Sequence, residues 1–469
     1  MTDTQEKRGF LANLKGFSQA FWVANWVELL ERLAYYAVFI VLTIYLSNVW
    51  GFSDVEAGVI SGLFSSFLYF LPTFTGAYAD KIGFRSAIIL AFALLTAGYA
   101  GLGILPTLLQ SAGLVEYGIG KETATIFYGL EESSLRWTIA PILLLIVVGG
   151  SFIKAVISGT VARETTEANR ARGYAVFYMM VNIGAFTGKT VVDPLRKALG
   201  DSGLVYLNFF SAFMTLLALV AVFFLYKSVQ TQGKGKSFGE IWSALIKVCK
   251  NGRLIALILI VSGFWLVQSQ MYASMPKYVI RMVGENATPG WYANVNPLIV
   301  FLCVNFITSL MRNKKAITSM TVGMFIIPFS ALIMAGGNFI GSDYILGLHP
   351  VAFMMVIGIA FQALAECFIS PRFLEYFSLQ SPKGEEGLYL GFSHLHSFFS
   401  YLIAFPVGGL LLEKFCPDPR NFAGGQTSLE YAQATAHAHY LWFVFVGIGI
   451  ISAIALIIYN KIVNKEVKN

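Results

Sequence analysis

Three charged side chains and two tyrosines lie within nine residues near the start of the chain. The segment reads Glu28-Leu-Leu-Glu31-Arg32-Leu-Ala-Tyr35-Tyr36, and aliphatic and aromatic residues flank it on both sides. Positions three and four apart are neighbours on a helix, so Glu28, Glu31, Arg32 and Tyr35 share one face. Each charge near a bilayer centre costs about 2.5–3.5 kcal/mol on insertion scales. Three charges in such a place indicate a polar cavity inside a membrane protein.

Glu28, Glu31 and Arg32 have the chemistry of a proton-exchange site. Burial favours the neutral form of a carboxyl group and a neighbouring arginine favours the charged form, so a carboxylate under both influences can gain and lose a proton. Pairing with Arg32 also lowers the cost of burying either acid. The alternative interpretation is a static ion pair that locks helix packing.

The composition of the whole chain indicates a helical protein with many membrane spans. Its 469 residues are 56% hydrophobic and 13% charged, and the mean hydropathy is +0.66. Apolar runs long enough to cross a bilayer predict spans at roughly 19–48, 57–79, 84–106, 137–162, 172–194, 204–226, 254–279, 290–311, 317–339, 349–378, 387–412 and 438–461. We expect no removable signal peptide, and the first span is the expected insertion signal.

The net charge of +7 reports membrane orientation and not a nucleic-acid partner. Lysine and arginine concentrate in the segments that share a side with both termini, such as the stretch around Arg312, Lys314 and Lys315. The positive-inside rule then places both termini in the cytoplasm, in a plasma or bacterial inner membrane.

The cysteines and histidines predict neither a disulfide framework nor a metal site. Cys303 and Cys367 fall within spans, while Cys249 and Cys416 fall on opposite sides of the membrane. We expect no cofactor, and we find no nucleophile–base pair that would indicate an enzyme.

The spans divide six and six around a polar interruption. We predict an N-terminal half over 1–227, a cytoplasmic linker over 228–252 rich in Gly, Lys and Gln, and a C-terminal half over 253–469. Two six-span halves around a midplane site are the plan of the major facilitator fold. The segment Gly76-Ala-Tyr-Ala-Asp80-Lys81-Ile-Gly83-Phe-Arg85 resembles the loop motif of that superfamily, in which a tight turn lets two helix ends approach closely.

Four segments, in order along the chain, resemble signatures of the proton-dependent oligopeptide transporter family. The first is the Glu28 to Tyr36 motif, with Leu33 where the family has Phe. The others are Tyr174-Ala-Val-Phe177-Tyr178-Met-Met-Val-Asn182-Ile-Gly184-Ala-Phe186, then Asn294-Val-Asn296-Pro297, then Glu366-Cys-Phe-Ile-Ser370-Pro371 followed by Gly387 and Gly391. The resemblance extends over essentially the whole chain.

This resemblance implies roles for residues that spacing alone does not assign. Lys154, in the fourth span, is implied to contact a substrate carboxylate or to respond to protonation with Glu28, Glu31 and Arg32; snorkelling to the cytoplasmic face is the alternative. Glu366 is implied to receive a substrate amino group, unless it is a protonated structural residue. The other implied substrate contacts are Tyr35, Tyr36, Tyr69, Tyr178, Asn182, Trp265, Asn296 and Ser370, although ordinary packing explains the aromatic ones as well.

This sequence departs from the family in three places, and two of the departures remove an expected charge. Phe39 stands where relatives carry a second arginine in the first helix, and Ala155-Val156 replaces the Pro-Asn that usually follows the lysine. The sequence 268–270 lacks the acid that usually pairs with that lysine. We therefore predict that Lys154 pairs with Glu31.

The sequence predicts an all-α, twelve-helix major facilitator protein that carries di- or tripeptides by proton-coupled symport and alternating access. The alternatives are a proton-linked transporter of a non-peptide organic solute and a transport-inactive binding relative. Protons, a small peptide-like solute and the lipid bilayer are the expected partners; the oligomeric state is left open. Lys189 with Asp193, and His394 with His396, keep ambiguous roles.

Overall fold

The computed structural model describes residues 16–115, 130, 133–166, 169–227, 237–341, 344–379 and 392–466. Gly387 and Gly391 lie outside these ranges, as does 228–236 of the expected linker.

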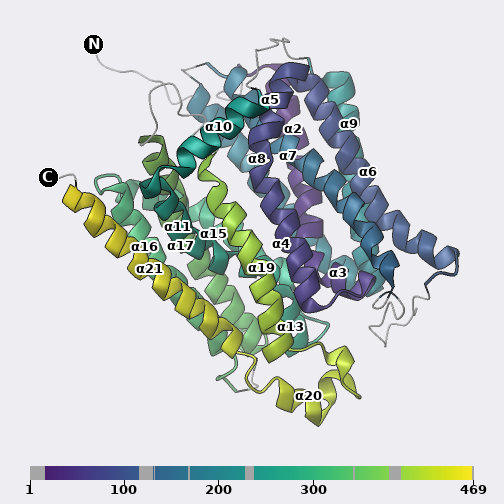
Figure 1. Cartoon of the computed structure of the whole chain (residues 1–469). Coiled ribbons are helices and arrows are strands. Elements are labelled where there is room, and N and C mark those ends of the chain that lie inside the picture. Colours follow the sequence, from purple (N-terminus) through teal and green to yellow (C-terminus); the bar gives the residue numbers. More distant parts are fainter. Residues whose placement is uncertain are drawn as a thin grey trace.

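The chain forms a bundle of long helices with its two termini near the same end (Figure 1). The first group comprises α2 (Gln19–Phe39), α3 (Leu42–Trp50), α4 (Asp54–Phe70), α5 (Pro72–Ile82), α6 (Phe84–Ser111), the 3₁₀ turn η1 (Ser134–Thr138), α7 (Ile139–Arg163), α8 (Arg170–Leu199) and α9 (Asp201–Leu225). The second comprises α11 (Gly252–Gln268), α12 (Gln270–Ala273), α13 (Met275–Val283), α14 (Pro289–Ala293), α15 (Val295–Leu310), α16 (Ala316–Gly336), α17 (Pro350–Leu379), α19 (Leu395–Phe415), α20 (Leu429–Ala434) and α21 (Tyr440–Glu466).

The number of spans agrees with the twelve that hydropathy predicts. Within the described ranges, ten helices are long and apolar enough to cross a membrane, and two further pairs qualify as single bent spans. The pair α2 and α3 bends by 52°, and the pair α4 and α5 bends by 47°. The second bend has a clear cause, because Pro72 opens α5 and cannot donate the backbone hydrogen bond that would continue α4.

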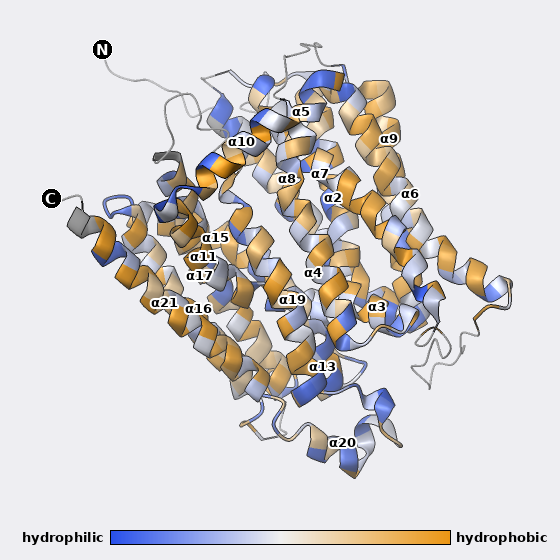
Figure 2. Ribbon diagram, viewed as in Figure 1, coloured by the Kyte–Doolittle hydropathy of each residue, from blue (hydrophilic) through white to orange (hydrophobic). Residues whose placement is uncertain are grey.

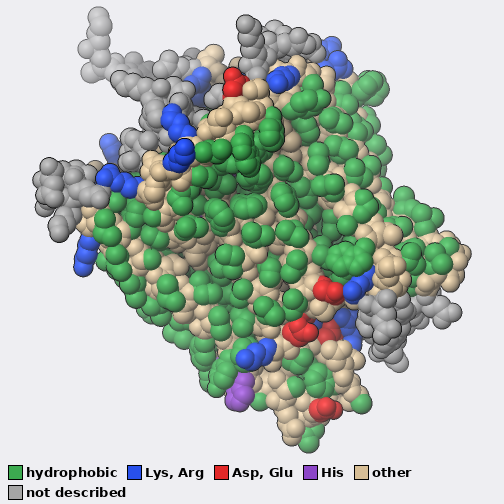
Figure 3. Space-filling view, in the orientation of Figure 1, with side chains coloured by type: hydrophobic (Ala, Val, Ile, Leu, Met, Phe, Trp, Pro, Cys, Tyr) green, Lys and Arg blue, Asp and Glu red, His purple; other side chains and the backbone are tan. Residues whose placement is uncertain are grey.

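An apolar belt surrounds the bundle between two more polar ends. Figure 2 shows hydrophobic residues along the outward faces of the helices, and Figure 3 shows charged side chains gathered toward the two ends. Large apolar side chains such as Phe224, Phe306 and Ile451 are about two-thirds exposed in the isolated chain. Such a belt fits lipid and not water, so the chain is a multi-pass integral membrane protein.

Part of the expected linker forms a helix that its composition did not predict. Helix α10 (Phe238–Cys249) begins at a capping box in which Ser237 and Glu240 each satisfy the other's backbone N–H. The Phe238 and Trp242 rings lie 5.1 and 6.5 Å from the ring of Phe74 on α5. This helix is therefore anchored on the second span.

The loop between α5 and α6 has the tight turn that the sequence predicts. Gly83 connects the two helices with a positive φ of 86°, which favours glycine. Asp80 accepts a hydrogen bond of 2.8 Å from Arg163 at the end of α7. The turn and the ion pair hold three helix ends together.

Helix α8 packs directly on the backbone of α2, where the charged first-helix cluster lies. A Cβ on Gly184 would come within 2.6 Å of the Leu29 carbonyl oxygen and 2.7 Å of the Arg32 Cβ. Any larger residue therefore forces the two helices apart.

We expect Gly184→Val to destabilise the protein by about 1–3 kcal/mol, because the close contact between α2 and α8 is lost. Thermal unfolding in detergent measures the change. Gly447→Val on α21 is the matched control, since a Cβ there meets no atom within 4 Å. Equal unfolding temperatures for the two variants would contradict this account of the helix contact.

Candidate functional site

The charged residues of α2 form one buried ion cluster, as their spacing predicts. Arg32 lies 3.1 Å from Glu28 and also pairs directly with Glu31. All three side chains are less than 10% exposed, and the Arg32 guanidinium lies 5.5 Å from the centre of the Tyr35 ring. Two carboxylates share one guanidinium in this cluster, so a proton gained by either acid makes the cluster neutral.

Lys154 does not form the ion pair with Glu31 that we predicted from the sequence. Its Nζ atom instead lies 3.4 Å from the centre of the Tyr69 ring, and it is buried without a hydrogen-bond partner among the described residues. Glu31 is held by Arg32, which sits next to it on the same helix. The prediction was wrong because it chose a partner for Lys154 only by opposite charge. Glu31 already forms an ion pair with Arg32, its neighbour in the sequence. The position of the ammonium over a buried ring also excludes snorkelling in this conformation.

Glu366 of α17 is held by two neutral amides. Asn296 Nδ2 donates to Glu366 Oε2 at 3.1 Å, and Gln268 Nε2 donates to the same oxygen at 2.9 Å. Asn182 was expected to help here, but its amide donates to the Tyr178 carbonyl oxygen on its own helix. Ser370, one turn beyond Glu366, has a buried hydroxyl with no partner among the described residues.

Several of the predicted aromatic residues contact other rings, and Tyr36 does so across the two groups of helices. Tyr35 and Tyr36 meet edge to face at 5.1 Å, Tyr36 lies 6.2 Å from Tyr272, and Trp265 stacks on His396 at 5.3 Å. Tyr178 is 62% exposed in the isolated chain and so does not close the site.

Phe39 replaces the expected charge with an apolar contact. Its ring stacks on Tyr35 at 4.9 Å and lies 4.8 Å from Tyr272 on α12. The first helix therefore meets the second group of helices here through aromatic packing, at the position where the family resemblance implied an arginine.

Sequence reasoning left several residues of this region unassigned. Lys189 of α8 is 1% exposed, donates to the Ala293 carbonyl oxygen at 3.0 Å and lies 5.5 Å from the Tyr36 ring. Asp193 accepts from the Trp291 N–H at 3.0 Å. Both residues thus bind the α14 segment and not each other. The position of Lys189 and Asp193, four residues apart among apolar neighbours on α8, indicated that both are buried. It did not identify the partner of either residue.

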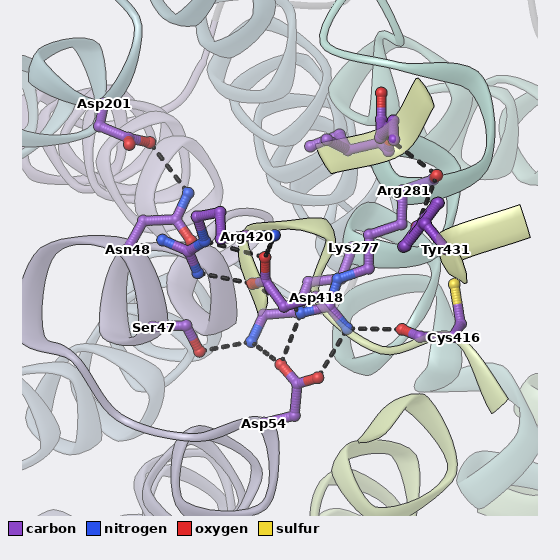
Figure 4. A network of polar contacts seen from close by, with 12 residues as sticks. Ser47, Asn48, Asp54, Asp201, Lys277, Arg281, Cys416, Asp418, Arg420 and Tyr431 are labelled. Carbon is purple, nitrogen blue, oxygen red and sulfur yellow. Dashed lines mark hydrogen bonds and ion pairs between the residues drawn. The ribbon is translucent and has the colours of Figure 1, made fainter. Parts of the chain in front are cut away.

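A second polar network closes the end of the bundle opposite the termini, between α3, α4 and α13 (Figure 4). Asp54 accepts from Lys277 at 2.6 Å and from Arg281 at 2.6 and 3.0 Å. Lys277 also donates to Ser47 at 2.6 Å, and Arg281 donates to Asp418 at 3.1 Å. We name this set of five residues the α13-end latch.

The latch joins the first group of helices to the second with buried charges. Burial lowers the pKa of Arg281, but the Asp54 and Asp418 carboxylates outweigh it and hold that pKa above its ordinary value. Asp54, Lys277 and Arg281 are each less than 10% exposed. Losing one member would leave an uncompensated buried charge.

Comparison with known proteins identifies the family. A family model described as Major Facilitator Superfamily matches residues 25–346. The chain belongs to the Major Facilitator Superfamily. The predicted all-helical major facilitator fold is thereby confirmed, and this superfamily is one of transporters.

Relatives within the superfamily support the narrower assignment. Dipeptide and tripeptide permease B of Photorhabdus asymbiotica is 25% identical over 437 residues, which cover 84% of this chain and 86% of that protein. Dipeptide and tripeptide permease A of Proteus mirabilis is 22% identical over 506 residues, which cover 94% of each. The resemblance to the proton-dependent oligopeptide transporter family is confirmed.

Solved structures of that family share this fold. The transporter PepTSo superposes with a TM-score of 0.68 at 16% identity, covering 95% of this chain and 98% of the other. A family transporter in complex with 5-aminolevulinic acid superposes with a TM-score of 0.67 at 16% identity, covering 97% and 98%. At this identity the similarity establishes the fold alone.

Proposed function

We propose that this major facilitator protein takes up di- or tripeptides by proton-coupled symport. The observation that carries the proposal is a cation and an anion, neither of which forms a direct ion pair among the described residues. Lys154 lies over the Tyr69 ring, and Glu366 is held by neutral amides. A peptide carries both missing charges, a carboxylate for Lys154 and an ammonium for Glu366.

Proton coupling follows from the first-helix cluster. Glu28 and Glu31 share the one guanidinium of Arg32 inside a buried site. A proton that binds to either acid weakens the ion pair of that acid with Arg32. It also changes the electrostatic potential at the substrate site. The names of the relatives support peptides as the substrate, and they favour peptides over a non-peptide solute.

Alternating access requires two halves that rock about this site. We propose that 1–227 and 253–469 are those halves, and that the membrane is a bacterial inner membrane with both termini cytoplasmic. The α13-end latch then lies on the outer face, and this structure is closed to the outside. Protonation from outside, binding of peptide between Lys154 and Glu366, and closure of the latch are the proposed order of events.

Uptake into proteoliposomes tests the proposal directly. Labelled dialanine is added outside under an inward proton gradient, with a protonophore as the control. We expect accumulation that the protonophore abolishes. No gradient-dependent uptake across a broad panel of di- and tripeptides would refute peptide symport, and binding of these peptides without flux would identify a transport-inactive relative.

Lys154→Gln should weaken the apparent affinity for dialanine by about tenfold or more. Removing a charge-assisted hydrogen bond costs about 1.5–3 kcal/mol, and 1.4 kcal/mol corresponds to a factor of ten. The KM for uptake measures the loss. Lys461→Gln, on the exposed surface of α21, is the control. An unchanged KM would remove Lys154 from the proposed carboxylate site.

A further inference from the structure

Gln268 has a buried carbonyl oxygen that the proposed function does not use. It is the last residue of α11 and is 4% exposed. Its Nε2 donates to Glu366 Oε2 at 2.9 Å, while its Oε1 is buried without a hydrogen-bond partner among the described residues. The Gln268 amide therefore has a hydrogen-bonded N–H and a carbonyl oxygen without a hydrogen bond, both next to the Glu366 carboxylate.

The two amides orient the Glu366 carboxylate, and one of its oxygens already accepts two hydrogen bonds. Asn296 and Gln268 both donate to Oε2, so further donors are directed to Oε1 of the carboxylate. An unsatisfied buried acceptor such as Gln268 Oε1 costs about 1–3 kcal/mol, and this cost disappears when a donor arrives. An ammonium group has three N–H donors and can satisfy both free oxygens at once.

The other buried base near this carboxylate is already engaged. Lys189 donates to the Ala293 carbonyl oxygen at 3.0 Å. Among the described residues Lys189 donates to this carbonyl oxygen and forms no ion pair or hydrogen bond with Glu366 or with Gln268, so the free acceptor of Gln268 remains open to a ligand donor.

We propose that Gln268 is a substrate-contacting residue and also a positioning residue for Glu366. Its N–H holds the carboxylate in place, and its carbonyl oxygen accepts an N–H from the amino terminus of a peptide. This inference rests on the proposed function and deepens it, because it assigns the residue that selects a free amino group. An acceptor pair of this kind disfavours solutes that lack a primary ammonium.

A comparison of two ligands tests this role. Binding of dialanine and of propionyl-alanine, its analogue without the amino group, is measured on the purified full chain by competition against labelled dialanine. We expect Gln268→Met to weaken dialanine binding about tenfold and to leave the affinity for propionyl-alanine nearly unchanged. The preference for the free amine therefore falls about tenfold.

Gln362→Met provides a matched control. Gln362 is also a fully buried glutamine that faces α11, but its amide donates to the Val267 carbonyl oxygen at 3.4 Å. We expect this variant to keep the wild-type preference. The unfolding temperature without ligand is recorded for both variants, so that a general loss of stability is recognised.

The outcomes separate this inference from the proposed function. If the wild-type protein binds no dipeptide, the proposed function fails. If it binds dialanine and Gln268→Met binds it equally well, the inference alone fails. Equal weakening of both ligands by Gln268→Met assigns Gln268 a purely structural role and also overturns the inference.

Discussion

Glu31→Gln is expected to abolish proton-driven accumulation of peptide, down to the level of protein-free liposomes. Glutamine keeps the size of the side chain and its hydrogen bonding to Arg32, but it cannot carry a proton. Glu28 is then the one carboxylate paired with Arg32, at 3.1 Å, and we expect this one-to-one ion pair to stay charged and carry no proton. Exchange of labelled for unlabelled peptide across the membrane needs no net proton movement, so we expect exchange to persist.

The comparison of driven uptake with exchange makes this result specific. Loss of both activities would indicate that Glu31→Gln disrupts the site as a whole, and driven uptake at the wild-type rate would show that the proton binds elsewhere. Glu430→Gln, at an exposed acid in the first turn of α20, serves as the control.

Asp54→Asn is expected to open the α13 end. Asp54 is the acid that joins Lys277 and Arg281 to the first group of helices. Removing one partner of a buried ion pair costs about 3–5 kcal/mol, because Lys277 stays buried without its ion pair and Arg281 keeps only Asp418. A cost of this size falls on the closed state alone and therefore moves the population strongly toward the open state.

Spin labels at two exposed positions measure this opening. Leu114, just after α6, and Leu429, at the start of α20, are 57% and 75% exposed and belong to the two groups of helices. Cys249 and Cys303 are replaced by serine to keep labelling specific. We expect the label-to-label distance to increase in Asp54→Asn and to stay unchanged in Asp201→Asn, whose described hydrogen bond comes from the neutral amide of Asn48. An unchanged distance in Asp54→Asn would show that other contacts hold this end closed.

The sequence predicted those features that depend on local spacing. Glu28, Glu31 and Arg32 are three and four residues apart on one helix, and their clustering follows from helical geometry before any tertiary contact is known. The tight turn between α5 and α6 was likewise predicted from Gly83 and its neighbours in the sequence. The spans follow from hydropathy, although the bends at Pro72 and beyond Phe39 shorten individual helices.

The features that the sequence missed depend on contacts between distant elements. Asp54 and Lys277 are 223 residues apart, and nothing in either segment identifies the other. Gln268 was read only as the absence of an acid, because its partner Glu366 lies 98 residues further on. The expected pairing of Lys154 with Glu31 failed for the same reason, since charge counts do not say which partner is nearer.

The burial of the α13-end latch makes its ion pairs insensitive to the ionic strength of the surroundings. Dissolved salt screens exposed charges over about 8–10 Å, but it has little access to groups that are as buried as Asp54, Lys277 and Arg281. The ion pair between Glu56 and Arg136, at the same end, is partly exposed and should weaken at high salt concentration. The closure of the α13 end should therefore be almost the same at low and at high salt.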